Sequence, residues 1–507
     1  MQIQAKLSRF DQIEDQALVF GCFEQQPKLT GILKEVDDKL SGAIFNLLTT
    51  GDFSGKLEQT AVVYPRMKIN AARIILTGLG KKNEITLEKI RRAYGHAGKK
   101  VKELKLNNVS VQALEEVSPR IKLQESSQTM VEGLSLSNYK FDRYKTGDGD
   151  QKESLQNLIF LASDRKKIAE IEKGLKDGEI FSWAANFTRD LANRPSNQLT
   201  PEDFGQVAIK LARENQLKCR VLSKPQIEKL GMNAFLAVGS GSSQPPTLTI
   251  LEYFPPRKKS DTLVLVGKGI TFDAGGVSLK DTENMLEMKG DMTGGAVVLS
   301  TLAAAAKLKL PVHLIGIVPA AENLPSGTAL KIGDIIKSHS GKTIEVLNTD
   351  AEGRLILADA LSYARSFKPD AIIDVATLTA AIKIALGPIC AGIFSDHQGL
   401  KSRMIQAGER SGERVWPMPL WDEYAPFLES DLADIKNVGG RWGGASLAAV
   451  FLKAFVGDVP WLHLDIAGVD FKDKTIDLEK YYSYWTKGAT GFGARLLLQF
   501  LKDWKNI

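Results

Sequence analysis

The chain has 507 residues, of which 43% are hydrophobic and 25% are charged. This composition excludes a disordered chain, a collagen-like repeat and a small disulfide scaffold, and the length predicts two to four domains. Lysine and arginine number 66 and aspartate and glutamate 60, so the net charge of +6 permits an acidic partner without demanding one.

The first 160 or so residues alternate strand-like and helical patterns. Apolar, β-rich runs predict strands at 17–24, 71–80, 109–114 and 158–163, and an amphipathic run with a basic face predicts a helix at 87–104. The polar, glycine- and aspartate-rich stretch 137–154 predicts a loop. We therefore expect a small N-terminal α/β domain over residues 1–165.

A long helical pattern follows, from Asp164 to about Asn193. It ends before Pro195, because the residue that precedes a proline disfavours helix. We expect this linker helix, residues 166–195, to join the first domain to a second domain over residues 196–507.

The second domain alternates apolar strand patterns with helical ones. Strands are predicted at 219–224, 247–254, 262–269, 312–320, 371–378 and 463–469, and helices at 294–309, 354–367 and 443–456. Nearly all-apolar strands are typical of a sheet covered on both faces. The prediction is a larger three-layer α/β/α domain.

Several features predict a cytoplasmic protein without a membrane span. The first residues lack the basic and apolar regions of a signal peptide. The longest apolar stretch, Ala371 to Phe394, is interrupted by Asp374 and Lys383, so it predicts a buried strand and a helix. The cysteines Cys22, Cys219 and Cys390 form no close pair, which fits a reducing compartment.

Three segments of the second domain concentrate charge beside apolar strands. Lys268, Asp273 and Lys280 follow a strand in a glycine-rich stretch predicted to turn, Asp291 precedes an alanine-rich helix, and Asp350, Glu352 and Arg354 precede another helix. Residues two apart in an extended segment face the same side. We therefore expect the last three to point into one cavity at the carboxyl ends of the strands.

Four carboxylates in one cavity require compensating cations. Two divalent ions about 3.5–4 Å apart would supply them in a hydrolytic site. The chain has only five histidines and no HExxH motif, so any metal must be held mainly by oxygen. Oxygen ligands favour Mg²⁺ or Mn²⁺, and a lysine nitrogen would add tolerance for Zn²⁺ or Co²⁺.

The same carboxylates have a plainer interpretation. Asp291, Asp350 and Glu352 each precede a helix, where an acidic residue often serves as an N-cap. The segments alone leave helix capping and metal binding as alternatives.

The segments GKGITFDAGGVSLK and NTDAEGRLILADAL, with others in the same order, resemble the leucyl aminopeptidase (cytosol aminopeptidase) family of dinuclear metallopeptidases. This resemblance implies metal ligands at Lys268, Asp273, Asp291, Asp350 and Glu352, and a catalytic pair at Lys280 and Arg354. It implies that Asp273 and Glu352 bridge two ions, Mn²⁺ or Zn²⁺, and that Arg354 holds a bicarbonate.

The resemblance also implies a substrate pocket and an assembly. Lys280, Met288, Thr377 and Ala380 match positions that contact substrate, although Ala380 replaces a glycine usual in the family. The family's members form homohexamers.

We therefore expect a metal-dependent aminopeptidase. It would release N-terminal leucine or another large apolar residue from peptides by means of a metal-bridged water. Two other classes are a DNA-binding regulator on the same scaffold, for which no nucleic-acid reading motif is present, and a catalytically inactive relative.

Overall fold

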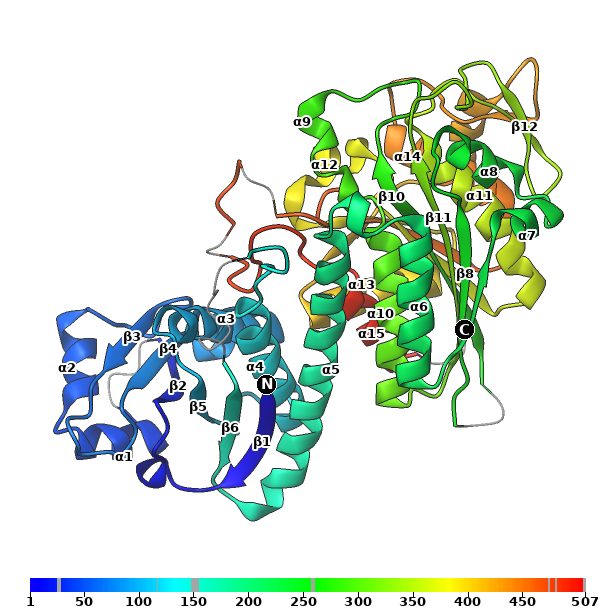
Figure 1. Ribbon diagram of the computed structural model, residues 1–507. Helices are drawn as coiled ribbons and strands as arrows, with labels where there is room; N and C mark the ends of the chain where they lie inside the picture. Colours follow the sequence, from blue (N-terminus) through cyan, green and yellow to red (C-terminus); the bar gives the residue numbers. More distant parts are fainter. Residues whose placement is uncertain are drawn as a thin grey trace. The chain divides into compact units, whose positions relative to one another are not determined.

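The computed structural model (Figure 1) describes residues 1–24, 29–115, 117–146, 155–256, 260–472, 475–478 and 481–504. It divides into two compact units, Met1–Trp183 with Asp473–Lys487, and Ala184–Lys472 with Gly488–Ile507. The division falls within one long helix, α5 (Ile168–Ala192). Compared with the predicted division, the linker helix is shared between the two units, and Asp473–Lys487 groups with the first unit.

The first unit is built on a six-stranded sheet in the order β1-β6-β5-β2-β4-β3, parallel except for β3 at one edge. Its strands are β1 (Gln2–Leu7), β2 (Ala17–Phe23), β3 (Thr60–Val63), β4 (Ile74–Gly80), β5 (Asn108–Gln112) and β6 (Asn157–Ala162). Its other helices are α1 (Gly31–Lys39), α2 (Ala43–Thr50), α3 (Leu87–Glu103) and α4 (Leu123–Ser137).

Helices cover both faces of this sheet because alternate strand residues point to opposite sides. In β2, Ala17 and Val19 belong to the core beneath α3 and α4, whereas Leu18 and Phe20 belong to the core beneath α1 and α2. Of the predicted loop 137–154, residues 147–154 lie outside the described residues, and 138–146 contain no helix or strand.

The second unit is built on a nine-stranded mixed sheet in the order β16-β15-β18-β14-β9-β11-β8-β7, with β10 paired to β11. Its strands are β7 (Lys218–Leu222), β8 (Thr247–Tyr253), β9 (Thr262–Gly267), β10 (Gly269–Asp273), β11 (His313–Asn323), β14 (Ala371–Ala376), β15 (Ala391–Phe394), β16 (Val415–Pro417) and β18 (Trp461–Asp465). A small second sheet contains β12 (Ile335–Lys337), β13 (Thr343–Glu345) and β17 (Ile435–Lys436).

Helices again cover both faces of the large sheet. They are α6 (Pro201–Asn215), α7 (Lys224–Lys229), α8 (Asn233–Val238), α9 (Thr282–Met285), α10 (Thr293–Leu308), α11 (Glu352–Ala364), α12 (Ala380–Leu386), α13 (Gln398–Ser411), α14 (Gly444–Val456) and α15 (Ala494–Lys502). α10 packs against α6 and α15, and α11 packs against α8 and α14 (Figure 1). This arrangement confirms the predicted α/β fold with a small first part and a larger three-layer second part.

The four central strands, β18, β14, β9 and β11, are parallel, so their carboxyl ends meet at one edge. The apolar stretch that begins at Ala371 forms the predicted strand, β14, and the predicted helix, α12. The further strand β15 follows them. Among the described residues no helix has the length and apolar character that a membrane span requires.

Candidate metal centre

The charged segments converge at the carboxyl ends of the parallel strands. Lys268 lies between the end of β9 and the start of β10, and Asp273 is the last residue of β10. The glycine-rich stretch therefore forms strand up to Asp273, and the predicted turn lies not at Lys268 but at 276–278. Both strands pair with β11, and β9 also pairs with β14.

Lys268 is the buried centre of the cluster, with only 3% of the residue exposed. Its Nζ lies 2.8 Å from Asp291 Oδ2 and 2.7 Å from Glu352 Oε1, and it donates a hydrogen bond of 2.9 Å to a backbone carbonyl oxygen, that of Thr377. Burial alone would lower the pKa of Lys268, but the Asp291 and Glu352 carboxylates outweigh burial and raise it. In this arrangement the two carboxylates favour the ammonium form of Lys268.

A glycine makes the approach of Lys268 to the helix α11 feasible. A Cβ atom at Gly353 would stand 2.8 Å from Lys268 Nζ and 2.7 Å from its Cε. Any side chain at this position would push the lysine away from Glu352.

Lys280 forms a second cationic contact with the cluster. Its Nζ lies 2.9 Å from Asp273 Oδ2 and also pairs with Asp350. Asp273 is fixed from its other oxygen, since Oδ1 accepts hydrogen bonds of 2.8 Å from Gly275 N and from Asn323 Nδ2. Burial would lower the pKa of Lys280, but the neighbouring Asp273 carboxylate and the other acidic groups raise it.

The carboxylates crowd one another. Ligand oxygens of Asp273, Asp350 and Glu352 all lie within 4.8 Å of each other. Burial, followed by the charge of a neighbouring carboxylate, raises the pKa of Asp273 and of Asp350, and burial raises that of Asp291 well above its ordinary range. Two lysines cannot neutralise four ionised carboxylates, so bound cations would be needed to balance the remaining negative charge.

The geometry rejects the interpretation of these carboxylates as helix caps. The N-cap residue is Met292 in α10 and Ala351 in α11. Within the described residues, neither forms a capping hydrogen bond with its side chain. Asp291 instead accepts a hydrogen bond of 2.7 Å at Oδ1 from the Thr377 hydroxyl. Glu352 Oε2 is buried and has no hydrogen-bond partner in the described part of the chain.

Arg354 lies on α11 and is buried. Its Nη1 donates a hydrogen bond of 2.7 Å to Asn437 O, and burial lowers its pKa to about 10. The expectation of an extended segment here is wrong, because α11 already begins at Glu352. Asp350 and Glu352 still converge, because Asp350 lies in the turn before α11 and Glu352 is the first residue of that helix.

Two sequence profiles match the chain. The catalytic domain of the cytosol aminopeptidase family matches residues 186–498, and the N-terminal domain of that family matches residues 19–148. The chain belongs to the cytosol aminopeptidase family. It is an aminopeptidase, a hydrolase of peptides, as its sequence predicts.

Individual relatives agree along almost the whole chain. A probable cytosol aminopeptidase of Geobacter sp. (strain M21) is 43% identical over 488 residues, which cover 96% of each chain. A solved variant of tomato leucine aminopeptidase is 33% identical with a TM-score of 0.87, covering 99% of this chain and 96% of its own. The bottromycin maturation enzyme BotP, solved in complex with Mn, is 31% identical with a TM-score of 0.83, covering 96% and 99%.

The residues expected to contact substrate lie on segments beside the cluster. Thr377 is buried and is joined to the cluster by its hydroxyl and its carbonyl oxygen. Met288 is half-buried in the single turn that precedes Asp291, and Ala380 is exposed at the start of α12. Of the four expected residues, Lys280 and Thr377 contact the carboxylates with their side chains, and Met288 accepts a backbone hydrogen bond of 3.3 Å from Asp291 N.

Sequence reasoning missed the residues that hold these segments in place. Asp465, at the end of β18, accepts hydrogen bonds from Leu378 N at 3.1 Å and from the Thr379 hydroxyl at 2.7 Å, and so fixes the segment that carries Thr377. Asn323, at the end of β11, donates to Asp273 Oδ1 and to Thr349 O. A polar residue that ends an apolar strand is the sequence signal that both share with Asp273.

Proposed function

We propose that this cluster binds two divalent ions, Mn²⁺ or Zn²⁺, and removes the N-terminal residue from peptides, preferring leucine or another large apolar residue. The observation that carries the proposal is the buried convergence of Asp273, Asp350 and Glu352 with their oxygens within 4.8 Å of one another. The presence of Mn in the related BotP structure supports the choice of metal.

The donor set fits such ions. Four carboxylates supply hard oxygen ligands, and the unpartnered Glu352 Oε2 is an orphaned acceptor that a cation would satisfy. We assign Lys268, Asp273, Asp291, Asp350 and Glu352 as the ligands. Lys268 would have to give up its proton to coordinate an ion, because an ammonium group has no lone pair.

Divalent ions held by these residues would polarise the substrate's carbonyl oxygen and lower the pKa of a water molecule towards neutrality. Lys280 then supplies a positive charge to the reacting centre. Its side chain is 16% exposed, and its raised pKa favours the protonated form. We assign it to the substrate's carbonyl oxygen as negative charge develops there.

Arg354 acts as a cation and not as a base. Burial lowers its pKa only to about 10, so the guanidinium remains protonated at neutral pH. Its Nε is buried without a hydrogen-bond partner among the described residues, which leaves a donor for an anion. We assign Arg354 to holding a bicarbonate that carries the proton.

A free α-amine at the substrate is the feature that would confine cleavage to the first residue. The test uses leucine p-nitroanilide and its N-acetyl derivative with the intact protein. We expect rapid release of p-nitroaniline from the first and none from the second. Comparable hydrolysis of the acetylated compound would contradict an aminopeptidase site.

Ala380 sets a prediction about substrate preference. We propose that its methyl group narrows the pocket for the substrate's first side chain. A methylene-sized change in such a pocket alters discrimination between substrates by roughly 1–3 kcal/mol. Ala380→Gly should therefore raise kcat/KM for phenylalanine substrates relative to leucine substrates. Both substrates are measured on both proteins, so that a loss of stability cancels, and an unchanged ratio would remove Ala380 from the pocket.

We also propose that the protein assembles as a homohexamer in the cytoplasm. Six chains of 55.5 kDa give a particle of about 330 kDa, and closed symmetry is usual for homo-oligomers. Sedimentation velocity at micromolar concentration should show this species. A single monomeric boundary would refute the assembly without touching the chemistry proposed above.

A further inference from the structure

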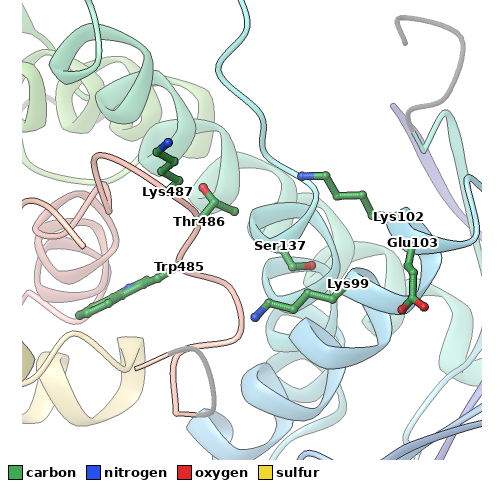
Figure 2. A pocket seen from close by; sticks show the side chains of 7 residues that line it. All are labelled: Lys99, Lys102, Glu103, Ser137, Trp485, Thr486 and Lys487. Carbon is green, nitrogen blue, oxygen red and sulfur yellow. The ribbon is translucent and has the colours of Figure 1, made fainter. Parts of the chain in front are cut away.

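A cavity of about 350 Å³ opens on the first unit (Figure 2). It is lined by Lys99, Lys102 and Glu103 of α3, by Ser137 at the end of α4, and by Trp485, Thr486 and Lys487. All of these residues belong to the first unit, whereas every residue of the metal centre belongs to the second. The cavity therefore shares no residue with the metal centre, and its volume is at the lower end for small-molecule sites.

The charge of the cavity is positive. Three lysines from two distant parts of the sequence line it together with a single carboxylate, that of Glu103. Lys100, which does not line the cavity, pairs with this carboxylate at 2.6 Å. In Figure 2 the carboxylate of Glu103 points away from the ammonium end of Lys99.

Lys102 has the strongest reason to attract an anion. Its Nζ donates one hydrogen bond, of 3.1 Å, to Tyr139 O, which leaves other N–H groups of the ammonium to bind a ligand. Burial and the neighbouring Lys140 charge lower the pKa of Lys102. The Asp142 carboxylate acts in the opposite direction but does not outweigh these two causes, so a bound anion would further stabilise the charged form of Lys102.

The wall beside the lysines is polar at one point and rigid at another. Thr486 Oγ1 is buried and has no hydrogen-bond partner among the described residues, so its hydroxyl can donate a hydrogen bond to a ligand. Trp485 is only 3% exposed and stacks on Tyr482 with 4.1 Å between ring centroids. This stacking holds the segment that presents Thr486 and Lys487.

We propose that this cavity binds a small phosphate-bearing anion. A phosphate offers several acceptor oxygens and up to two negative charges, and lysine ammonium groups with a hydroxyl donor recognise that combination. Inorganic phosphate and a phosphorylated small molecule share this chemistry. The proposal does not depend on the function proposed for the metal centre.

The test is calorimetric titration of the intact, manganese-loaded protein with inorganic phosphate and, separately, with AMP. Loss of one charge-assisted hydrogen bond should weaken binding about tenfold, so Lys102→Gln and Lys487→Gln should each raise Kd by that factor. Glu103→Gln removes the cavity's carboxylate and should tighten binding, a gain that misfolding cannot produce. Lys89→Gln, on the same helix but paired with Glu84 outside the cavity, should leave Kd unchanged.

The outcomes separate the ligand's source from failure of the proposal. Equal affinity for both probes would assign the site to free phosphate, and tighter binding of AMP would assign it to a phosphorylated molecule. The same Kd in all variants would place the phosphate elsewhere, at the metal centre for example, and would overturn the proposal. Binding of a DNA duplex without binding of either small probe would also overturn it.

Discussion

Replacing Glu352 by glutamine should remove metal and activity together. Glu352 Oε1 pairs with Lys268, and Oε2 is the buried acceptor without a hydrogen-bond partner among the described residues. An amide keeps the shape of the side chain but loses its charge and one acceptor. Loss of an outer-shell partner alone typically costs 10–100-fold in metal affinity, so we expect a proposed ligand to cost at least about that much.

The measurement compares metal content and kcat with those of Glu322→Gln. Glu322 is also buried in the second unit, but its Oε2 accepts a hydrogen bond of 2.6 Å from the Ser242 hydroxyl, and it takes no part in the cluster. The control should retain its metal. A Glu352→Gln protein with two tightly bound ions and normal kcat would exclude Glu352 as a ligand.

Lys280→Ala should have a large effect of a different kind. Its ammonium contacts Asp273 and Asp350 but is not one of the proposed metal ligands. Its removal should therefore leave the metal ligands intact. If it stabilises the developing oxyanion, kcat should fall by roughly 10²–10³ with metal content retained. The split between activity and metal content distinguishes Lys280 from the ligands.

Lys337→Ala is the matched control, because Lys337 is an exposed lysine on β12 of the same unit. It should change neither quantity. Unchanged kcat in Lys280→Ala would eliminate the residue from the mechanism, and loss of metal in that variant would make its role structural.

The sequence predicts most of this site because its chemistry sits at strand ends. Asp273 ends an apolar strand, Asp291 precedes α10 and Glu352 begins α11, so a parallel sheet brings them to one edge. Composition also limits the ligands to oxygen and lysine. The assignment of roles to these residues depends on the family resemblance.

Other features depend on tertiary contacts that no local pattern reveals. Asp465 acts on a segment 86 residues earlier, and its hydrogen bonds exist only because β18 lies beside β14. The helix α4 was not predicted, since it is serine-rich and buried almost throughout, without a single apolar stripe. It packs closely on α3, where a Cβ at Gly133 would lie 2.4 Å from Arg91 O.

We propose that this aminopeptidase works through ions held by its carboxylate cluster. The most direct measurement is leucine p-nitroanilide hydrolysis after prolonged chelation, with metal content followed by elemental analysis. We expect activity to vanish as the metal is removed and to return on addition of Mn²⁺ in proportion to the metal rebound, up to two ions per chain. Full activity of a protein that elemental analysis finds free of metal would contradict the account.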